Sequence, residues 1–185
     1  MEKGAENYEK YCNGDNDGLT GLVEEYRGGL ILYIYGIVRD MYAAEDLCED
    51  TFYRLITKRP KFDGGKASFR TWLYRMARNI AYDAMRHENT IRFSEIEPED
   101  AAADRTSLED RYIDGERKRV LLEQIKKLSQ NDRELLWLTY FEDMSAPEIS
   151  KLTGKPVGNV NKALSRARQK LREYLKEEGY GNENE

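Results

Sequence analysis

Apolar residues recur every three or four positions along most of this chain, which is the spacing of one face of an α-helix. The clearest runs cover residues 19–39, 43–58 and 69–87, and the same period returns from residue 117 onward. No run alternates apolar and polar residues as a half-buried β-strand does. The pattern therefore predicts an all-α protein.

Breaks in this pattern divide the chain into parts. Residues 88–115 are acidic, contain Pro98 and carry few large apolar side chains, which is typical of a linker. The sequence therefore predicts two small helical domains joined by an acidic linker. In full, the expected parts are an N-terminal tail (1–18), a helical domain (19–90), the linker (91–116), a helix-turn-helix domain (117–176) and an acidic tail (177–185).

The segment SAPEISKLTGKP, which begins at Ser145, carries the signals of two consecutive helices. Ser145 and Glu148 have the spacing of a capping box, in which each side chain can bond the other residue's backbone N–H. Pro147 in the first turn costs no hydrogen bond, and Gly154 suits the left-handed end of a helix. Pro156 then favours a new helix start, so a helix-turn-helix is predicted.

The helix that follows is expected to have two different faces. Its apolar face consists of Val157, Val160, Leu164, Ala167 and Leu171. Its opposite face carries Lys155, Asn159, Lys162 and Arg166, flanked by Asn161, Ser165 and Arg168, with no acidic residue among them. Arg, Lys and Asn side chains can bond base edges or phosphates of the major groove, so the pattern favours duplex DNA binding over an ordinary solvated face.

Charge is arranged in blocks, although the net charge of the chain is -5. Residues 54–87 carry 9 basic and 2 acidic side chains, and residues 117–172 carry 13 basic and 6 acidic ones. An acidic segment separates the two basic blocks. This alternation indicates a protein that contacts a polyanion at two places.

Aromatic residues are interleaved with the charges of the first basic block. Its arginines include Arg70, Arg75, Arg78 and Arg86, and the rings between them are Tyr74 and Tyr82. Charges can follow the phosphates of a single strand while rings stack on exposed bases, so this segment is expected to bind single-stranded DNA. Trp72 shares a stripe with apolar residues and is expected to lie in the core.

Other classes of protein fit less well. No run approaches the roughly eighteen apolar residues of a membrane span, and the N-terminus lacks a signal-peptide core, so a cytoplasmic protein without membrane insertion is expected. Cys12 and Cys48 lack metal-ligand spacing and are expected to be free thiols, and no metal or other cofactor is predicted. His87 and Asp83 belong to no catalytic motif, so the chain is expected not to be an enzyme.

Two long stretches resemble the bacterial RNA polymerase sigma factors of the extracytoplasmic-function (ECF) group, within the sigma-70 family. The N-terminal segments that carry the resemblance are AAEDLCEDTFYRLI and KFDGGKASFRTWLYRMARNIAYDAMR. The C-terminal segment is MSAPEISKLTGKPVGNVNKALSRARQKLREYL. Together the similar regions span roughly residues 19–90 and 118–176, in the order and with the linker length of the family.

The resemblance implies a non-catalytic protein that joins core RNA polymerase, recognises the minus-ten and minus-thirty-five promoter elements and promotes DNA melting. It implies duplex contacts of the recognition helix through Lys155, Pro156, Val157, Asn159, Asn161, Lys162, Ser165, Arg166 and Arg168. It implies contacts with the single-stranded near element through Phe62, Asp63, Lys66, Ser68, Arg70, Tyr74, Arg75, Arg78, Asn79, Tyr82 and Arg86. Core-polymerase binding is implied for Asp46, Leu47, Glu49, Asp50 and Phe52.

The family further implies that the loop Phe62–Ser68 holds one flipped base, that the linker points toward the polymerase active cleft, and that an anti-sigma protein is a partner. Asn159 and Asn161 depart from the usual recognition helix, which leaves the sequence of the far promoter element open. The alternative is an autonomous helix-turn-helix repressor or activator. It explains residues 118–172 but leaves the basic and aromatic residues of 70–86 without a role.

Overall fold

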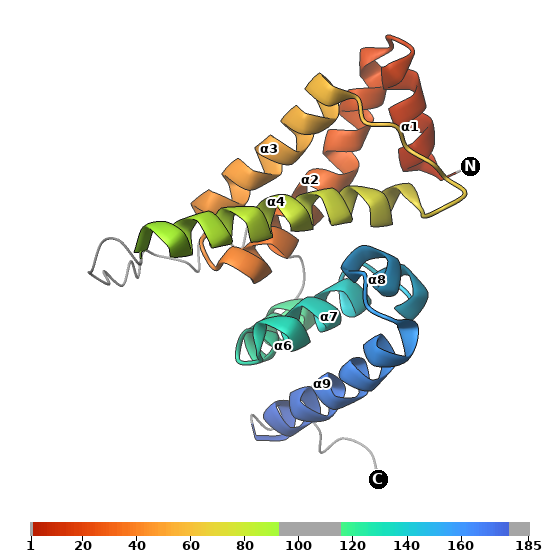
Figure 1. Cartoon of the computed structure of the whole chain (residues 1–185). Coiled ribbons are helices and arrows are strands. Elements are labelled where there is room, and N and C mark those ends of the chain that lie inside the picture. Colours follow the sequence, from red (N-terminus) through yellow and green to blue (C-terminus); the bar gives the residue numbers. More distant parts are fainter. Residues whose placement is uncertain (1, 93–115, 178–185) are drawn as a thin grey trace. The chain divides into compact units, whose positions relative to one another are not determined.

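The computed structural model of the chain describes residues 2–92 and 116–177 (Figure 1). Every secondary-structure element in these two stretches is a helix, which confirms the predicted fold class. The helices belong to two compact units, one within residues 1–112 and the other within residues 113–185. None of the described helices is long and apolar enough to cross a membrane.

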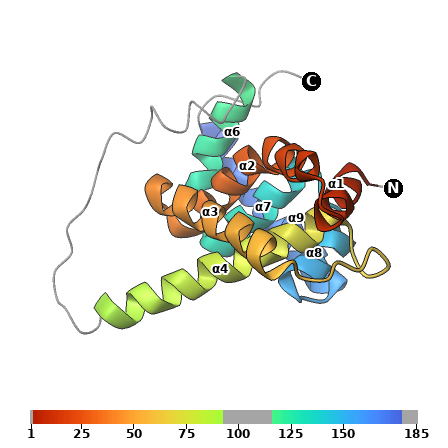
Figure 2. The same ribbon diagram turned by 90° about the horizontal axis from the view of Figure 1, so that it is seen from above.

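Within residues 2–92, the first unit contains four helices. They are α1 (Lys3–Cys12), α2 (Asn16–Val38), α3 (Met41–Lys58) and α4 (Phe69–Arg92). Helix α2 is central, because each of the other three packs against it (Figure 2). Its Leu22, Leu30 and Ile34 are fully buried together with Leu55 of α3 and Leu73 of α4.

Short polar residues begin α2 and α3 and keep the connections tight. The side chain of Asp15 accepts a hydrogen bond from the Asp17 N–H at 3.0 Å, and that of Asp40 accepts one from the Ala43 N–H at 2.8 Å. Arg39 ends α2 in the left-handed conformation with φ 61°. Successive helices of the unit are therefore neighbours in space.

Helix α1 corrects the predicted N-terminal tail over residues 1–18. Tyr8 and Tyr11 of α1 are only 4% and 5% exposed. The helix also approaches α2 closely, since a Cβ added at Gly18 would lie 2.7 Å from the backbone nitrogen of Tyr11. The apolar pattern missed this helix because tyrosine and glycine, rather than aliphatic residues, form its buried face.

The part of the second unit that the structure describes, residues 116–177, also forms four helices, and α9 packs against the other three. They are α6 (Glu116–Lys126), α7 (Gln130–Tyr140), α8 (Ala146–Thr153) and α9 (Val157–Glu177). Trp137 of α7 is 3% exposed, and its ring stacks on Phe141 with the centroids 4.1 Å apart. The fully buried residues of this core include Ile125, Leu135, Leu136, Leu138, Ile149, Val160 and Ala167.

Helices α8 and α9 form the predicted helix-turn-helix. The backbone N–H of Ser145 donates to the Glu148 carboxylate at 2.9 Å, as a capping box requires. Gly154 ends α8 with φ 75°, a left-handed conformation that other residues adopt at a cost of about 1 kcal/mol. The Ser150 hydroxyl donates to the backbone oxygen of Lys155 at 2.6 Å and so ties α8 to the start of α9.

Candidate nucleic-acid and polymerase interfaces

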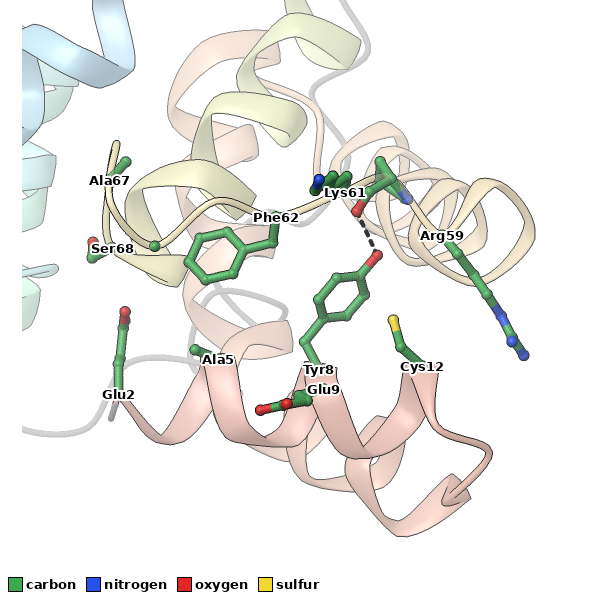
Figure 3. Close-up of a pocket in the computed structure, with 12 residues that line it drawn as sticks. Glu2, Ala5, Tyr8, Glu9, Cys12, Arg59, Lys61, Phe62, Ala67 and Ser68 are labelled. Atoms are coloured by element: carbon green, nitrogen blue, oxygen red, sulfur yellow. Dashed lines mark hydrogen bonds between the residues drawn. The ribbon is translucent and has the colours of Figure 1, made fainter.

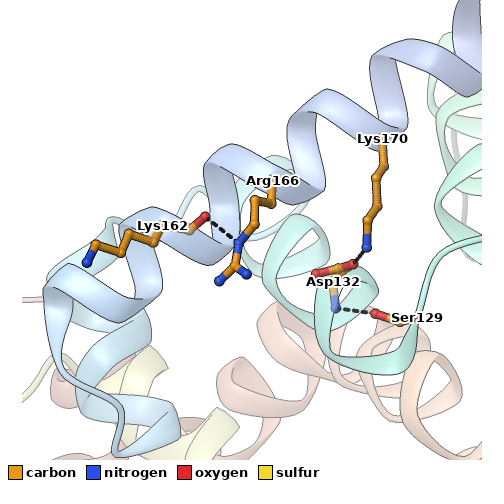
Figure 4. Close-up of polar contacts among 5 residues, drawn as sticks. All are labelled: Ser129, Asp132, Lys162, Arg166 and Lys170. Atoms are coloured by element: carbon orange, nitrogen blue, oxygen red, sulfur yellow. Dashed lines mark hydrogen bonds and ion pairs between the residues drawn. The ribbon is translucent and has the colours of Figure 1, made fainter.

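The outward face of α9 is exposed as predicted. Its exposed polar residues are Asn159, Asn161, Lys162, Ser165, Arg166 and Arg168. The Arg166 Nε donates to the backbone oxygen of Lys162 at 3.3 Å, so both cationic side chains project from the same stretch of α9 (Figure 4). This stretch therefore presents amides, hydroxyls and positive charge to solvent without any acidic neighbour on the helix.

Three of the residues predicted to bind duplex DNA lie directly before α9 or at its first position. The Lys155 amine bonds the side-chain oxygen of Asn131, at the start of α7, and Lys155 is only half exposed. Pro156 is exposed, and Val157 is 40% exposed. The prediction that Val157 belongs to the buried stripe is therefore wrong, because the helix begins there, beyond the edge of the core.

Another cation of α9, Lys170, has a structural contact. Its amine lies 2.7 Å from the carboxylate of Asp132, which is 8% exposed in the first turn of α7 (Figure 4). The backbone N–H of Asp132 donates in turn to the Ser129 hydroxyl at 3.4 Å. This ion pair holds α9 against α7, so Lys170 has a structural partner although its side chain is 51% exposed.

A basic and aromatic surface forms on α4. The guanidinium carbon of Arg78 lies 4.4 Å from the centroid of the Tyr82 ring, a cation–π geometry. Arg86 forms an ion pair with Asp83 one turn earlier. A depression of about 480 Å³ is lined by Arg54, Arg78, Asn79, Tyr82, Asp83 and Arg86. Four predicted residues thus lie together, and Arg54 of α3 joins them although the sequence interpretation did not include it.

Tyr74 does not belong to this surface. Its side chain is 1% exposed, and its ring packs against Tyr33 of α2 with the centroids 5.2 Å apart. The ring therefore cannot stack on a base, and its predicted role in binding single-stranded DNA is wrong. Of the neighbouring arginines predicted with it, Arg75 is exposed and Arg70 is half-buried.

The loop of residues 59–68, between α3 and α4, begins with an aromatic cluster. The ring of Phe62 lies 5.4 Å from those of Phe69 and Trp72, and Tyr8 of α1 lies 5.5 Å from the same two rings. Trp72 therefore packs among other rings, but it is half-buried rather than part of the fully buried core that was expected. The cluster joins α1, the loop and α4.

Polar contacts shape the rest of this loop. The Asp63 carboxylate accepts a hydrogen bond from the Gly65 N–H at 3.0 Å and pairs with the Lys66 amine at 3.4 Å. The Ser68 hydroxyl donates to the Thr71 hydroxyl at 2.8 Å. Asp63 and Lys66 are exposed, whereas Phe62 and Ser68 are half-buried.

The acidic residues of α3 are presented to solvent. Asp46, Glu49 and Asp50 are exposed, and Leu47 is half-buried. Phe52, however, is 7% exposed in the core of the unit. Its predicted direct contact with polymerase is therefore wrong.

Two exposed tyrosines extend this acidic surface. Tyr42 and Tyr53 are 64% and 67% exposed, which is unusual for aromatic side chains. At 100° per residue they share one stripe of α3 with Asp46 and Glu49, opposite the buried stripe. The sequence interpretation missed both, although their spacing from the acidic residues is the signal that could have found them.

The two cysteines have different environments. Cys48 is buried, its thiol lies 3.8 Å from the backbone oxygen of Arg27, and burial raises its pKa to about 12. Cys12 is exposed, and both are free thiols as predicted. Within the described residues, no three His, Cys, Asp or Glu side chains form a group that could hold a metal ion.

Comparison with known proteins places both units in one family. The Sigma-70 region 2 model matches residues 22–90, and the Sigma-70 region 4 model matches residues 118–171. The ECF RNA polymerase sigma factor SigW of Bacillus subtilis is 27% identical over 173 residues, which are 89% of this chain and 92% of SigW. The RNA polymerase sigma factor CarQ of Myxococcus xanthus is 30% identical over 169 residues, which are 91% of this chain and 95% of CarQ.

Solved structures show the same fold. The sigma factor RpoE from Bartonella quintana, in complex with the anti-sigma factor NepR, aligns with a TM-score of 0.69 at 23% identity over 87% of this chain and 98% of RpoE. CnrH, in complex with the cytosolic domain of CnrY, aligns with a TM-score of 0.59 at 22% identity over 94% of this chain and 95% of CnrH.

The two matched regions and the near full-length relatives show that the chain belongs to the sigma-70 family of RNA polymerase sigma factors, within its ECF group. The resemblance carried by the sequence segments is thereby confirmed. The chain functions as a sigma factor in promoter recognition. The alternative of an autonomous repressor or activator has no support among these relatives.

Proposed function

We propose that this sigma factor uses three separate surfaces to bring core RNA polymerase to its promoters. Helix α9 binds duplex DNA of the far element, α4 and the 59–68 loop bind single-stranded DNA of the near element, and α3 binds the polymerase. The chain acts in the cytoplasm and catalyses no reaction itself. The observation that carries the proposal is a pair of exposed basic faces, one in each of the two parts matched by the family.

The far element is recognised by the exposed face of α9. Asn159 and Asn161 have the amide geometry that bonds adenine, while Arg166 and Lys162 suit guanine or nearby phosphates. The exposed methyl groups of Val157 suit contact with a thymine methyl. Lys155 and Pro156, at the start of the same helix, approach the sugar-phosphate backbone of the DNA.

The near element is bound after its strands separate. Arg78 and Tyr82 form a cation–π pair, so the ring and the charge are already positioned for a base and its phosphate. Asn79, Arg86 and the added Arg54 border the same depression. The loop Phe62–Ser68 holds one unstacked base beside this surface.

Core polymerase is bound by the outward stripe of α3. Along this stripe, Asp46 and Glu49 lie between the exposed rings of Tyr42 and Tyr53. The two negative charges are therefore flanked by an aromatic side chain on each side. Carboxylates steer association with a basic surface, and aromatic side chains contribute buried area once contact is made. We therefore include both tyrosines in the proposed interface.

Two further parts of the proposal depend on the family alone. The acidic linker, directed toward the polymerase active cleft, lies mostly outside the described residues. An anti-sigma protein is proposed as a partner, because RpoE was solved in complex with the anti-sigma factor NepR. We propose that this partner covers both basic faces.

In vitro transcription tests the proposal. Purified core polymerase is assayed on genomic promoter fragments with and without the full chain, beside a gel shift of the chain without polymerase. We expect polymerase-dependent initiation at defined start sites and weak binding by the chain alone. Tight specific binding without any new start site would overturn the proposal in favour of an autonomous regulator.

Variants then assign the surfaces. Glu49→Arg on α3 is expected to abolish binding to core polymerase, and Arg78→Ala on α4 is expected to reduce open-complex formation after polymerase binding. Glu24→Arg, at an exposed position of α2, is the matched charge-reversal control for α3. Equal loss of polymerase binding by both reversals would remove α3 from the interface.

A further inference from the structure

Helix α1 lies outside residues 22–90, the part matched by the region 2 family model, yet it contacts both ends of the 59–68 loop. At the start of the loop, the Tyr8 hydroxyl donates to the backbone oxygen of Pro60 at 2.7 Å. The guanidinium of Arg59 lies 5.0 Å from the centroid of the Tyr11 ring. The first residues of the loop, directly after α3, therefore contact two tyrosines of α1.

At the other end, Glu2 binds the first turn of α4. Its carboxylate accepts hydrogen bonds from the backbone N–H of Phe69 at 2.6 Å and from that of Arg70 at 3.2 Å. These N–H groups have no partner within α4, and a carboxylate is favoured there by the helix dipole. Helix α1 and Glu2, the residue directly before it, therefore hold the residues at both ends of the loop.

The Tyr8 hydroxyl is a dependable donor in this arrangement. A tyrosine hydroxyl is protonated at neutral pH, and burial raises the pKa of Tyr8 further above its ordinary value, so it also stays protonated in mildly alkaline solution. Its ring also packs against Phe69 and Trp72, which restricts its position. The Tyr8 side chain, held in place by these rings, consequently sets the distance between α1 and the loop.

A pocket of about 540 Å³ lies between α1 and the loop (Figure 3). Ala5, Tyr8 and Glu9 line it from α1, and Phe62 lines it from the loop. The Glu9 side chain is exposed, and Lys61 is an exposed cation at the rim. Glu2 and Arg59 also line the pocket, but the Glu2 carboxylate is bonded to the start of α4. The pocket therefore combines aromatic rings and small apolar side chains with the Glu9 carboxylate and two positive charges.

These groups match the parts of one unstacked nucleotide. A base can stack on the Phe62 ring, and its phosphate can approach Lys61. A carboxylate accepts hydrogen bonds but donates none at neutral pH, so it favours a base edge with an exocyclic amino group. Adenine, cytosine and guanine carry such a group on the edge that is free in a single strand, whereas thymine does not.

We propose that α1 and the 59–68 loop together form the pocket for a single flipped base, and that Glu9 selects a base with an exocyclic amino group. Tyr8 and Glu2 are positioning residues that hold the loop at the required distance from α1. This inference rests on the proposed binding of the near promoter element by the loop.

The test measures how the complex of full chain and core polymerase binds labelled single-stranded oligonucleotides of its promoter. Each position of the near element is replaced by each natural base and by deoxynebularine, deoxyzebularine or deoxyinosine, which lack the amino group of adenine, cytosine and guanine, respectively. At one position we expect an amino-bearing base to bind about tenfold more tightly than its analogue without the amino group. Glu9→Ala should reduce that preference to less than about threefold, while Glu6→Ala on the same helix should preserve it.

The positioning role of Tyr8 is tested by a separate variant. Tyr8→Phe keeps the ring but removes the bond to Pro60, so we expect weaker binding of every base at that position with an unchanged order of preference. Thermal unfolding and polymerase binding of each variant show whether the fold is retained. Tyr8→Phe should leave both nearly unchanged.

The outcomes separate this inference from the proposed function. An amino-group preference that survives Glu9→Ala would overturn the role of α1 and leave the loop as the binding element. A wild-type complex without base preference at any position would overturn both the inference and the proposed role of the loop.

Discussion

Arg166 and Lys170 are one helical turn apart on α9, but their surroundings give them different roles. Arg166 is exposed and its Nε bonds the backbone oxygen of Lys162, whereas Lys170 pairs with the nearly buried Asp132. The first cation can leave its position to meet DNA. The second holds the helix in place.

Arg166→Ala is expected to weaken transcription mainly at promoters that depend on the far element. Loss of one base or phosphate contact of this kind costs about 1–3 kcal/mol, or roughly a 5- to 150-fold drop in affinity. Footprinting of the complex with core polymerase checks this, with Lys176→Ala, two to three turns further along α9, as the matched control. Unchanged footprints and transcription for Arg166→Ala would refute the assignment.

The two thiols should differ strongly in reactivity. Because burial raises the pKa of Cys48 from 9.0 to about 12, its thiolate fraction near neutral pH is about a thousandfold smaller than that of an unperturbed thiol. Iodoacetamide at pH 8 should therefore modify Cys12 in the folded chain and Cys48 only after unfolding. Peptide mass spectrometry measures both rates, and equal rates in the folded chain would contradict the burial of Cys48.

Most helices were predictable because their buried faces are aliphatic. The run over 43–58 corresponds to α3, and the signals at Ser145 and Gly154 correspond to the ends of α8. Helix α1 was missed because its contacts depend on Tyr8, Tyr11 and the close approach of Gly18, none of which contributes to aliphatic periodicity.

The candidate sites were less predictable than the helices that carry them. Tyr74 and Phe52 lie on the correct elements but face the core, since composition within a segment does not distinguish the two sides of a helix. Arg54 and Glu9 join their pockets from other helices, so only the packing of α3 and α1 reveals them.

Helices α1 and α2 should make the first unit sensitive to alkaline pH. Burial raises the pKa of Tyr8 and of Tyr26 above the ordinary value of 10.0. As pH rises through this value the unfolded chain loses these protons first, so the free energy of unfolding falls, by at most about 1.4 kcal/mol per pH unit for each group. Below the pKa of tyrosine in the unfolded chain, the contribution of these two groups to the free energy of unfolding is fully present.

Urea unfolding at pH 8 and pH 10.5 measures this effect. Tyr26→Phe should lessen the loss of stability between the two pH values, and Tyr53→Phe, at an exposed ring, is the matched control. A loss of stability in Tyr26→Phe equal to that of the wild type would show that Tyr26 does not contribute.

At the scale of the whole molecule, the acidic net charge coexists with two basic faces that we propose bind DNA and one acidic face that we propose binds polymerase. The charge pattern predicts that promoter binding by the polymerase complex weakens steeply with salt, because each neutralised phosphate releases counterions. Replacing both Lys162 and Arg166 by alanine should reduce the slope of log affinity against log salt by about 1–2. Gel shifts between 50 and 200 mM salt measure the slope, with Lys176→Ala expected to retain the wild-type value.

The aromatic cluster around Trp72 has a spectroscopic consequence. The chain has two tryptophans, Trp72 beside the 59–68 loop and Trp137 stacked on Phe141, so each unit contains one tryptophan. Substituting one tryptophan by phenylalanine leaves tryptophan emission from the other unit alone. Excitation of tryptophan thus reports on each unit separately, with Trp72 sensitive to the loop and Trp137 to the core of the helix-turn-helix unit.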